Sequence, residues 1–367
     1  MTTVTENFNL ADVVRDALRD ALKERGHVNI LIAGRSGVGK STLINSIFQG
    51  NLATTGQGRP VTQNTREIKK EGVPLSIFDT RGLEMADFSK TVGDVRSFVS
   101  ERSRGADPQQ HIHMAWVCIA EDLRRVEPAE EELVNMLSEY MPVVVVITKA
   151  RTDGGFRAEV QQILPNAKNV IRVRAVQEEL DEGFVLPPMN LRELVELTMQ
   201  VVPEGLKRAF TAAQKVDIGL KKKHSHAIVA GAAATAAGIA ATPIPFSDAV
   251  AIVPIQVAML AGIPATFGLS IDESFLTTVV GSILTGAGGT LAGRAIMSGL
   301  LKFIPGVGSV TGGALAATTA AALTTAFGEA YIAALEMLFT DGEGEPPTSE
   351  EVAEAFMQKY SMMAVAK

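Results

Sequence analysis

The chain has 367 residues, of which 46% are hydrophobic and 20% are charged, and its formal net charge is −7. This length allows two domains, and the negative balance argues against a dominant nucleic-acid surface, which needs a clustered excess of lysine and arginine. The single cysteine, Cys118, excludes an intrachain disulfide and fits a reducing compartment. The N-terminus carries charged residues in place of an apolar segment, so we expect no secretory signal there.

The first predicted element is an amphipathic helix in segment 1–26. Its apolar residues recur at spacings of three and four, which places them on one helix face: Leu10, Val13, Val14, Ala17, Leu18, Ala21 and Leu22. The opposite face mixes aspartate with arginine, and this mixture disfavours a helix that lies on a membrane surface. We therefore expect the apolar face to pack against protein.

A glycine-rich motif follows the first predicted strand. It fits the Walker A pattern G-x-x-x-x-G-K-[ST] and consists of Gly34-Arg35-Ser36-Gly37-Val38-Gly39-Lys40-Ser41-Thr42. Its glycines allow backbone N–H groups to turn toward phosphate oxygens, and the following helix directs its positive end at the same anion. Lys40 is expected to reach the β- and γ-phosphates, and the Ser41 hydroxyl to bind Mg²⁺. The strand–loop–helix context disfavours a chance match to a glycine-rich turn.

Two further segments favour a nucleotide site. The polar segment 56–65 suits a loop that the γ-phosphate and Mg²⁺ order, with Thr62 as the candidate Mg²⁺-sensing hydroxyl and Thr65 as the alternative. A solvated loop with incidental threonines is the other interpretation. The strand 75–80 then leads into a D-x-x-G pattern, in which Asp79 can hold Mg²⁺ through water and the Gly82 N–H can approach the γ-phosphate.

Strands and helices alternate through the first half of the chain. The predicted strands are 27–34, 66–72, 75–80, 111–120, 143–148 and 169–176, and the predicted helices are 40–49, 90–102, 128–140, 157–164 and 191–202. Continuous apolar strands indicate a sheet that is covered on both faces. The sequence therefore predicts an α/β domain at 27–203 with a doubly wound, mostly parallel sheet, which binds ligands beyond the carboxyl ends of its strands.

The composition changes near residue 205. Residues 204–340 are rich in alanine, glycine and threonine and predict an all-α domain, and 341–367 predict an acidic linker with a short helix. Three uncharged stretches, 227–247, 249–271 and 303–328, are long enough to cross a membrane. Their weakly apolar residues and internal prolines favour close-packed soluble helices at least as well. The basic segment 221–226 suits either anionic headgroups or a solvated helix face.

The nucleotide motifs together resemble the translation-factor-like class of GTP-binding domains, including Era-like and immunity-related GTPases, over about residues 27–202. The resemblance implies GTP or GDP with Mg²⁺, and it implies a base-recognition motif [NT]-K-x-D at Thr148 and Lys149. At the position of the motif's aspartate this chain has Arg151, so we expect Asp153 to supply the carboxylate. The last family motif, S-A-[KL], would place the N–H of Ala175 at the guanine O6.

The resemblance also bears on catalysis, which we assign to Lys40, Thr62 and Gly82, with Ser41, Thr62 and Asp79 at the metal. Many relatives carry a water-positioning glutamine after the D-x-x-G glycine, where this chain has leucine. An apolar side chain cannot orient the attacking water, so hydrolysis should be slow without an additional group. The alternatives for that group are a partner, Arg81, Glu84, or Arg35 acting on a neighbouring protomer. A solvent-facing arginine is the other interpretation of Arg35, and the one that we favour.

The C-terminal half resembles the helical domain of unknown function that follows some bacterial GTPase domains. The match covers about 210–335 and rests on segments 243–249, 253–259 and 301–308. The two resemblances imply an N-terminal helix packed on the C-terminal helices. They also imply a nucleotide-controlled switch or membrane-associated mechanoenzyme that forms dimers or oligomers. We expect a cytoplasmic protein with peripheral contact at the inner membrane face and without nucleic-acid partners. A binding module with negligible turnover, acting on a protein or ribosomal complex, and an ATPase are the alternatives.

Overall fold

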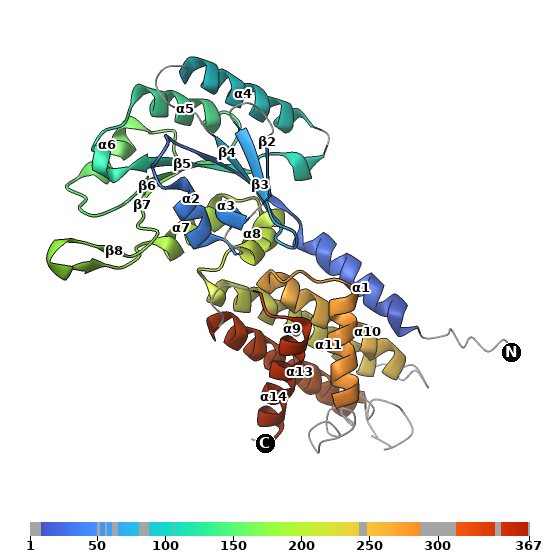
Figure 1. The fold of residues 1–367 in the computed structure, drawn as a ribbon. Coiled ribbons are helices and arrows are strands. Elements are labelled where there is room, and N and C mark those ends of the chain that lie inside the picture. The colour runs from blue at the N-terminus through green and yellow to red at the C-terminus, as the bar shows by residue number, and fades with distance from the viewer. Residues whose placement is uncertain are drawn as a thin grey trace. The chain divides into compact units, whose positions relative to one another are not determined.

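The computed structural model describes residues 9–49, 52–55, 57–60, 65–80, 88–105, 107–241, 248–286, 313–341 and 346–365. The chain divides into two compact units. One unit is Gly26–Asp217, and the other combines Met1–Arg25 with Ile218–Lys367. Figure 1 shows strands and helices in the first and helices alone in the second.

A seven-stranded sheet forms the centre of the Gly26–Asp217 unit, with strand order β2-β3-β4-β1-β5-β6-β7. The strands are β1 (Val28–Ala33), β2 (Gln57–Pro60), β3 (Thr65–Lys69), β4 (Leu75–Thr80), β5 (Met114–Ala120), β6 (Val143–Thr148) and β7 (Asn169–Arg172). Strands β4, β1, β5, β6 and β7 are parallel, whereas β2 and β3 extend the sheet by antiparallel pairing. The predicted mostly parallel α/β fold is confirmed.

Helices cover both faces of this sheet (Figure 1), which explains why its central strands are buried throughout and mostly apolar. On one face, buried side chains of α4 (Phe88–Arg104), α5 (Pro128–Ser138) and α6 (Phe156–Ile163) join those of the strands in one core. On the other, Trp116 of β5 stacks on Phe48 at 5.6 Å and donates through Nε1 to Thr198 Oγ1 at 3.2 Å. Thr198 belongs to α7 (Leu191–Val201), so the indole fastens that helix to the sheet.

The remaining elements of this unit are short. They are α2 (Lys40–Ile47), α3 (Leu52–Thr55), α8 (Lys207–Ala213) and a hairpin of β8 (Glu178–Glu179) and β9 (Val185–Leu186). Strand β2 occupies part of segment 56–65, where the sequence predicted a loop, and pairs with β3 from Gln57↔Lys69 to Pro60↔Arg66. An edge strand tolerates proline because one side of the strand needs no hydrogen-bond donor.

The boundary between the units differs from the expected one at residues 203 and 204. Helix α8 belongs to the α/β unit because Phe210 packs edge-on against Phe48 at 6.0 Å. In addition, Gln49 Nε2 donates to the carbonyl of Ala212 at 2.7 Å. The composition changes near residue 205, but these contacts extend the compact α/β unit to Asp217.

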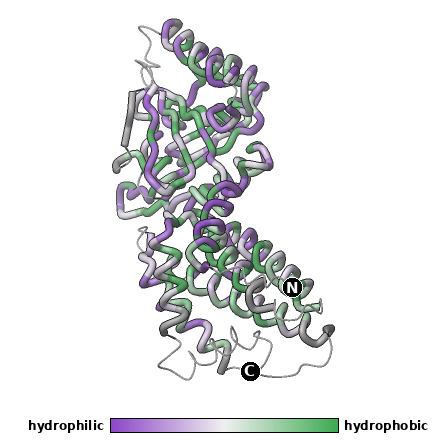
Figure 2. Tube along the Cα trace, turned by 90° about the vertical axis from the view of Figure 1, so that its right-hand side faces the viewer, coloured by the Kyte–Doolittle hydropathy of each residue, from purple (hydrophilic) through white to green (hydrophobic). Residues whose placement is uncertain are grey.

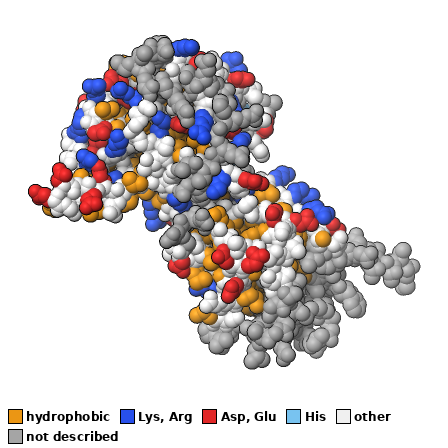
Figure 3. All heavy atoms as spheres, viewed as in Figure 1, with side chains coloured by type: hydrophobic (Ala, Val, Ile, Leu, Met, Phe, Trp, Pro, Cys, Tyr) orange, Lys and Arg blue, Asp and Glu red, His pale blue; other side chains and the backbone are white. Residues whose placement is uncertain are grey.

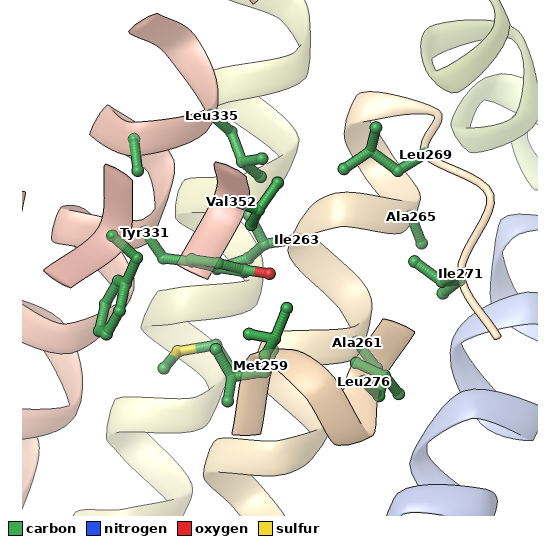
Figure 4. Packing of buried hydrophobic residues seen from close by; sticks show 14 of the residues in the cluster. Met259, Ala261, Ile263, Ala265, Leu269, Ile271, Leu276, Tyr331, Leu335 and Val352 are labelled. Atoms are coloured by element: carbon green, nitrogen blue, oxygen red, sulfur yellow. The ribbon is translucent and has the colours of Figure 1, made fainter. Parts of the chain in front are cut away.

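The helical unit contains α1 (Leu10–Arg25), α9 (Ile218–Ala241), α10 (Asp248–Phe267), α11 (Glu273–Gly286), α13 (Gly313–Asp341) and α14 (Ser349–Val365). Hydrophobic stretches recur along these helices (Figure 2). Val14 and Ala17 of α1 are buried in the same core as residues from α10, α11, α13 and α14, as the sequence predicted for the N-terminal helix. Figure 4 shows part of this core, in which Met259, Ile263 and Tyr331 lie close together.

Small residues allow α9 and α13 to pack closely. A Cβ atom at Gly328 of α13 would overlap Val229 of α9, and it would lie 2.9 Å from the sulfur of Met259 in α10. The alanine- and glycine-rich composition of this half therefore has a packing explanation within the described residues. Of the described helices, the segment Ala317–Asp341 alone is long and apolar enough to cross a membrane, and 44% of its most apolar window is buried. A core helix of a soluble protein passes the same test.

Candidate functional site

The loop between β1 and α2 has the backbone conformation that its glycines make accessible. Gly34, Gly37 and Gly39 have φ angles of +147°, +76° and +96°, values that residues with a side chain rarely adopt. Gly39 precedes the first helical residue, Lys40, in a left-handed conformation. The motif is thus a tight turn that leads directly into a helix N-terminus, a position suited to binding an anion.

Lys40 folds back over this loop. Its Nζ donates to the carbonyl oxygens of Gly34 at 2.7 Å and Arg35 at 3.0 Å. The side chain of Arg35 pairs within the chain, with Nη1 3.5 Å from Glu127 Oε1 at the start of α5. Ser36, Gly37, Ser41 and Thr42 are exposed around the loop and Val38 is buried beneath it.

One candidate metal ligand, Asp79, lies beside the end of β1. Asp79 is the register partner of Ile32, so the end of β4 lies beside the strand that leads into the glycine-rich loop. A carboxylate and the Ser41 hydroxyl are oxygen ligands of the kind that Mg²⁺ prefers, so these residues fit that cation. Thr62 and Gly82 lie outside the described residues, together with Arg81, Leu83 and Glu84. The alternative to Thr62, Thr65, is buried at the start of β3.

The loop after β6 is tied to the glycine-rich loop. Thr148 Oγ1 donates to the carbonyl oxygen of Val38 at 2.5 Å. The next residue, Lys149, is exposed and has a left-handed backbone with φ +53°, and its Nζ lies 3.5 Å from Asp122 Oδ2. The structure therefore brings Thr148 and Lys149 beside the predicted phosphate site, although the motifs lie far apart in sequence.

Glu121, a residue that the sequence reasoning missed, organises this second loop. Its buried carboxylate accepts hydrogen bonds from the backbone N–H groups of Arg151 at 2.5 Å and Thr152 at 3.0 Å, and from Arg172 Nε at 2.5 Å. Burial opposes ionisation, but the Arg172 guanidinium and the two N–H groups outweigh it and lower the pKa of Glu121. The sequence signal that could have identified Glu121 is an acidic residue directly after an apolar strand.

Glu121 should make stability depend on pH. Its folded-state pKa is lower than the ordinary value of about 4.3, so its contribution is fully present above that value and is lost as the pH falls through the folded-state pKa. We expect Glu121→Gln to lower the free energy of unfolding by about 1–3 kcal/mol at pH 7, measured by urea unfolding, and by less at acidic pH. Glu131→Gln, at an exposed position, is the control. A deficit that does not change with pH would contradict this assignment.

Asp153, the residue predicted to recognise the base, has structural partners. Its Oδ1 accepts from the N–H of Arg157 at 3.0 Å in the first turn of α6, and it lies 3.4 Å from Arg172 Nε. Arg124 donates to the carbonyls of Thr152 at 2.9 Å and Asp153 at 2.6 Å. The carboxylate thus caps a helix and pairs with an arginine, and its role toward a base stays a prediction.

The loop after β7 contacts the same region. Arg174 is buried and donates to the carbonyls of Ala150 at 2.8 Å and Pro187 at 2.5 Å, and Ala175 follows it in a half-buried position. Arg151, at the position of the family's aspartate, directs its guanidinium at Glu178. Nε lies 3.0 Å from Oε2, and Nη2 makes a second contact with Oε1. Sequence reasoning did not identify Glu178.

Two family models match the chain. Residues 29–149 match the family described as 50S ribosome-binding GTPase, and residues 208–361 match a domain of unknown function, DUF697. The tRNA modification GTPase MnmE of Cupriavidus metallidurans is 28% identical over 251 residues, covering 64% of this chain and 50% of the relative. MnmE of Burkholderia mallei is 31% identical over 188 residues, covering 47% and 38%. The chain thus spans half or less of the length of these relatives.

Two solved structures match about half of the chain at low identity and low TM-score. A probable GTP-binding protein EngB has 18% identity and a TM-score of 0.33, covering 47% of this chain and 98% of its own. Era in complex with MgGDPNP and nucleotides of 16S ribosomal RNA has 19% identity and a TM-score of 0.32, covering 49% and 58%. The family match and the MnmE relatives support GTP hydrolase activity in the α/β unit.

Proposed function

We propose that this chain, whose residues 29–149 match a GTPase family and whose residues 208–361 match DUF697, hydrolyses GTP to GDP and phosphate as a nucleotide-controlled switch. The observation that carries this proposal is the loop Gly34–Gly39, with its three left-handed glycines and Lys40 folded over it. The helical unit would act as the effector. Placement among Era-like or immunity-related GTPases is part of the proposal.

Different residues of the site bind the phosphates, the base and the metal ion. The N–H groups of residues 35–42 and the ammonium of Lys40 bind the phosphates, after Lys40 leaves the carbonyls of Gly34 and Arg35. Thr148, Lys149 and the Ala175 N–H lie on the base side. Ser41, Asp79 and Thr62 would hold Mg²⁺, which neutralises charge on the transferred phosphoryl group when bound. Leucine in place of glutamine after Gly82 favours slow hydrolysis unless self-association or a partner supplies the missing group.

Membrane contact is the second element of the proposal. Helix α13 contains the apolar segment Ala317–Asp341, and its exposed residues include Thr318 and Thr319. We propose reversible, peripheral contact of the helical unit at the inner face of the membrane and a cytoplasmic location for the α/β unit. Self-association in the GTP state would complete a dynamin-like cycle.

A ribosome-directed binding module is the alternative, since the matched family is described as ribosome-binding. Basic and acidic side chains are interspersed over the described residues of the α/β unit that face the viewer in Figure 3. A net charge of −7 also disfavours a nucleic-acid surface. We therefore favour the switch over a module that acts directly on RNA.

A nucleotide panel tests the proposal. Calorimetry with GTP, GDP, ATP and Mg²⁺ should show guanine preference, and phosphate release should rise more than linearly with protein concentration or on addition of anionic vesicles. Chelation of Mg²⁺ should abolish turnover. Tight GTP binding without turnover, together with sedimentation with 50S subunits, would favour the binding module instead. Preference for ATP would contradict both assignments.

A further inference from the structure

The guanine edge needs an acceptor that Arg151 cannot provide. That edge presents N1–H and the exocyclic amine as two parallel donors, and a carboxylate matches them with two acceptor oxygens. A guanidinium has donors only. A chain that binds guanine with Arg151 at this position must therefore supply the carboxylate from another residue.

Four carboxylates of the described residues lie in the loop Thr148–Asp153 or contact it, and each has a partner within the chain. What distinguishes Glu178 is that its partner is Arg151, the residue at the motif position. Glu121 is buried and already accepts from two backbone N–H groups and Arg172. Asp153 accepts from the N–H of Arg157 and pairs with Arg172. Asp122 lies 3.5 Å from the ammonium of Lys149 and follows β5 rather than the base-side loops.

The fourth carboxylate, Glu178, is partly exposed and is held by Arg151 itself. Its side chain is 29% exposed, and the Arg151 guanidinium contacts both of its oxygens. A carboxylate has about four lone-pair positions, so two remain for another pair of donors. Glu178 also follows closely after Ala175, whose N–H would contact the opposite end of the guanine edge.

The backbones of both partners of this ion pair are paired within the unit, and that of Glu178 pairs with Leu186 in the β8–β9 hairpin. Glu121 holds the N–H of Arg151, and Arg174 bridges the two loops through the carbonyls of Ala150 and Pro187. The hydrogen bond from Arg151, with further contributions from its charge and those of Arg174 and Lys149, lowers the pKa of Glu178 and keeps it ionised at neutral pH. The carboxylate is thus ionised and in contact with Arg151 in the absence of a ligand.

We propose that Glu178 supplies the carboxylate that recognises guanine, and that Arg151 is a positioning residue that holds it. The inference rests on the proposed GTPase function and identifies the specificity-determining residue of the same site. The ion pair reverses the usual arrangement of the motif. Arginine stands at the position of the family's aspartate, and the carboxylate comes from the segment after β7.

The test is a change of base preference. Glu178→Gln replaces one acceptor oxygen by an NH₂ donor, which mismatches guanine but matches the C2 carbonyl of xanthine. We expect affinity for MgGDP, measured by calorimetry, to fall about 10–100-fold, since hydrogen bonds to charged groups are lost, while affinity for MgXDP rises. Glu179→Gln, at the adjacent exposed residue of β8, should change neither affinity.

A second variant distinguishes loss of base recognition from misfolding. Arg151→Asp in the Glu178→Gln background returns a carboxylate to the family's motif position, and it should restore preference for GDP over XDP. Unchanged GDP affinity in Glu178→Gln, or a switch to XDP in Asp153→Asn instead, would overturn the assignment of Glu178. Failure of the wild-type chain to bind any guanine nucleotide would instead overturn the proposed function, and the inference with it.

Discussion

Replacement of Lys40 by alanine is expected to abolish detectable binding of MgGTP and, with it, phosphate release. In the structure the Lys40 ammonium reaches the carbonyls of Gly34 and Arg35, so it already lies within the loop that would surround the phosphates. Loss of about two charge-assisted hydrogen bonds costs about 3–6 kcal/mol, which corresponds to a loss of affinity of roughly 10²–10⁴-fold. Calorimetry with MgGTP measures this effect directly.

Lys168→Ala is the matched control for the Lys40 variant. Lys168 is an exposed lysine of the same unit, and its backbone N–H, which the substitution keeps, donates to Val143. The control should bind MgGTP as the wild-type chain does, and both variants should retain the helical and strand content of the wild type by circular dichroism. Unchanged GTP affinity in Lys40→Ala would show that the glycine-rich loop is not the phosphate site.

The central strands were predictable because of where they lie in the sheet. Strands β1, β5 and β6 are buried along their whole length, so their sequences are mostly apolar, as in residues 143–147 of β6. The edge elements lack this signal. Strand β2 lies in a polar segment with proline, and β7 ends at Arg172 rather than 176, after which Arg174 crosses to the neighbouring loop.

The candidate site was predictable only in part, for a related reason. The glycine-rich motif is visible because its left-handed backbone demands glycine at fixed spacings. Glu121 and Glu178 escape notice because their partners, Arg151 and Arg172, lie far from them along the chain and are brought close by parallel strand pairing. Spacing in the sequence indicates local geometry well, but it does not indicate contacts between residues that lie far apart along the chain.

Gly34→Ala is expected to cause the largest loss of stability among the loop variants. A Cβ atom at Gly34 would lie 2.5 Å from the carbonyl oxygen of Cys118 in the adjacent β5, and 3.2 Å from Val38 Cγ2. Cys118 is completely buried, so these neighbours cannot move aside. The same burial raises the pKa of the Cys118 thiol to about 12. The φ angle of +147° adds backbone strain for any residue with a side chain.

Overlap and strain cost about 1–3 kcal/mol each, so the free energy of unfolding in urea should fall by about 2–6 kcal/mol, with loss of nucleotide binding in parallel. Gly37→Ala separates the cost of atomic overlap from the cost of backbone strain. Its φ of +76° also disfavours alanine, but a Cβ atom there meets nothing within 4 Å. That variant should therefore lose only about 1–2 kcal/mol. Equal losses in the two variants would mean that backbone strain alone sets the requirement for glycine. A larger loss at Gly34 would show that the close approach of the loop to β5 is what requires it.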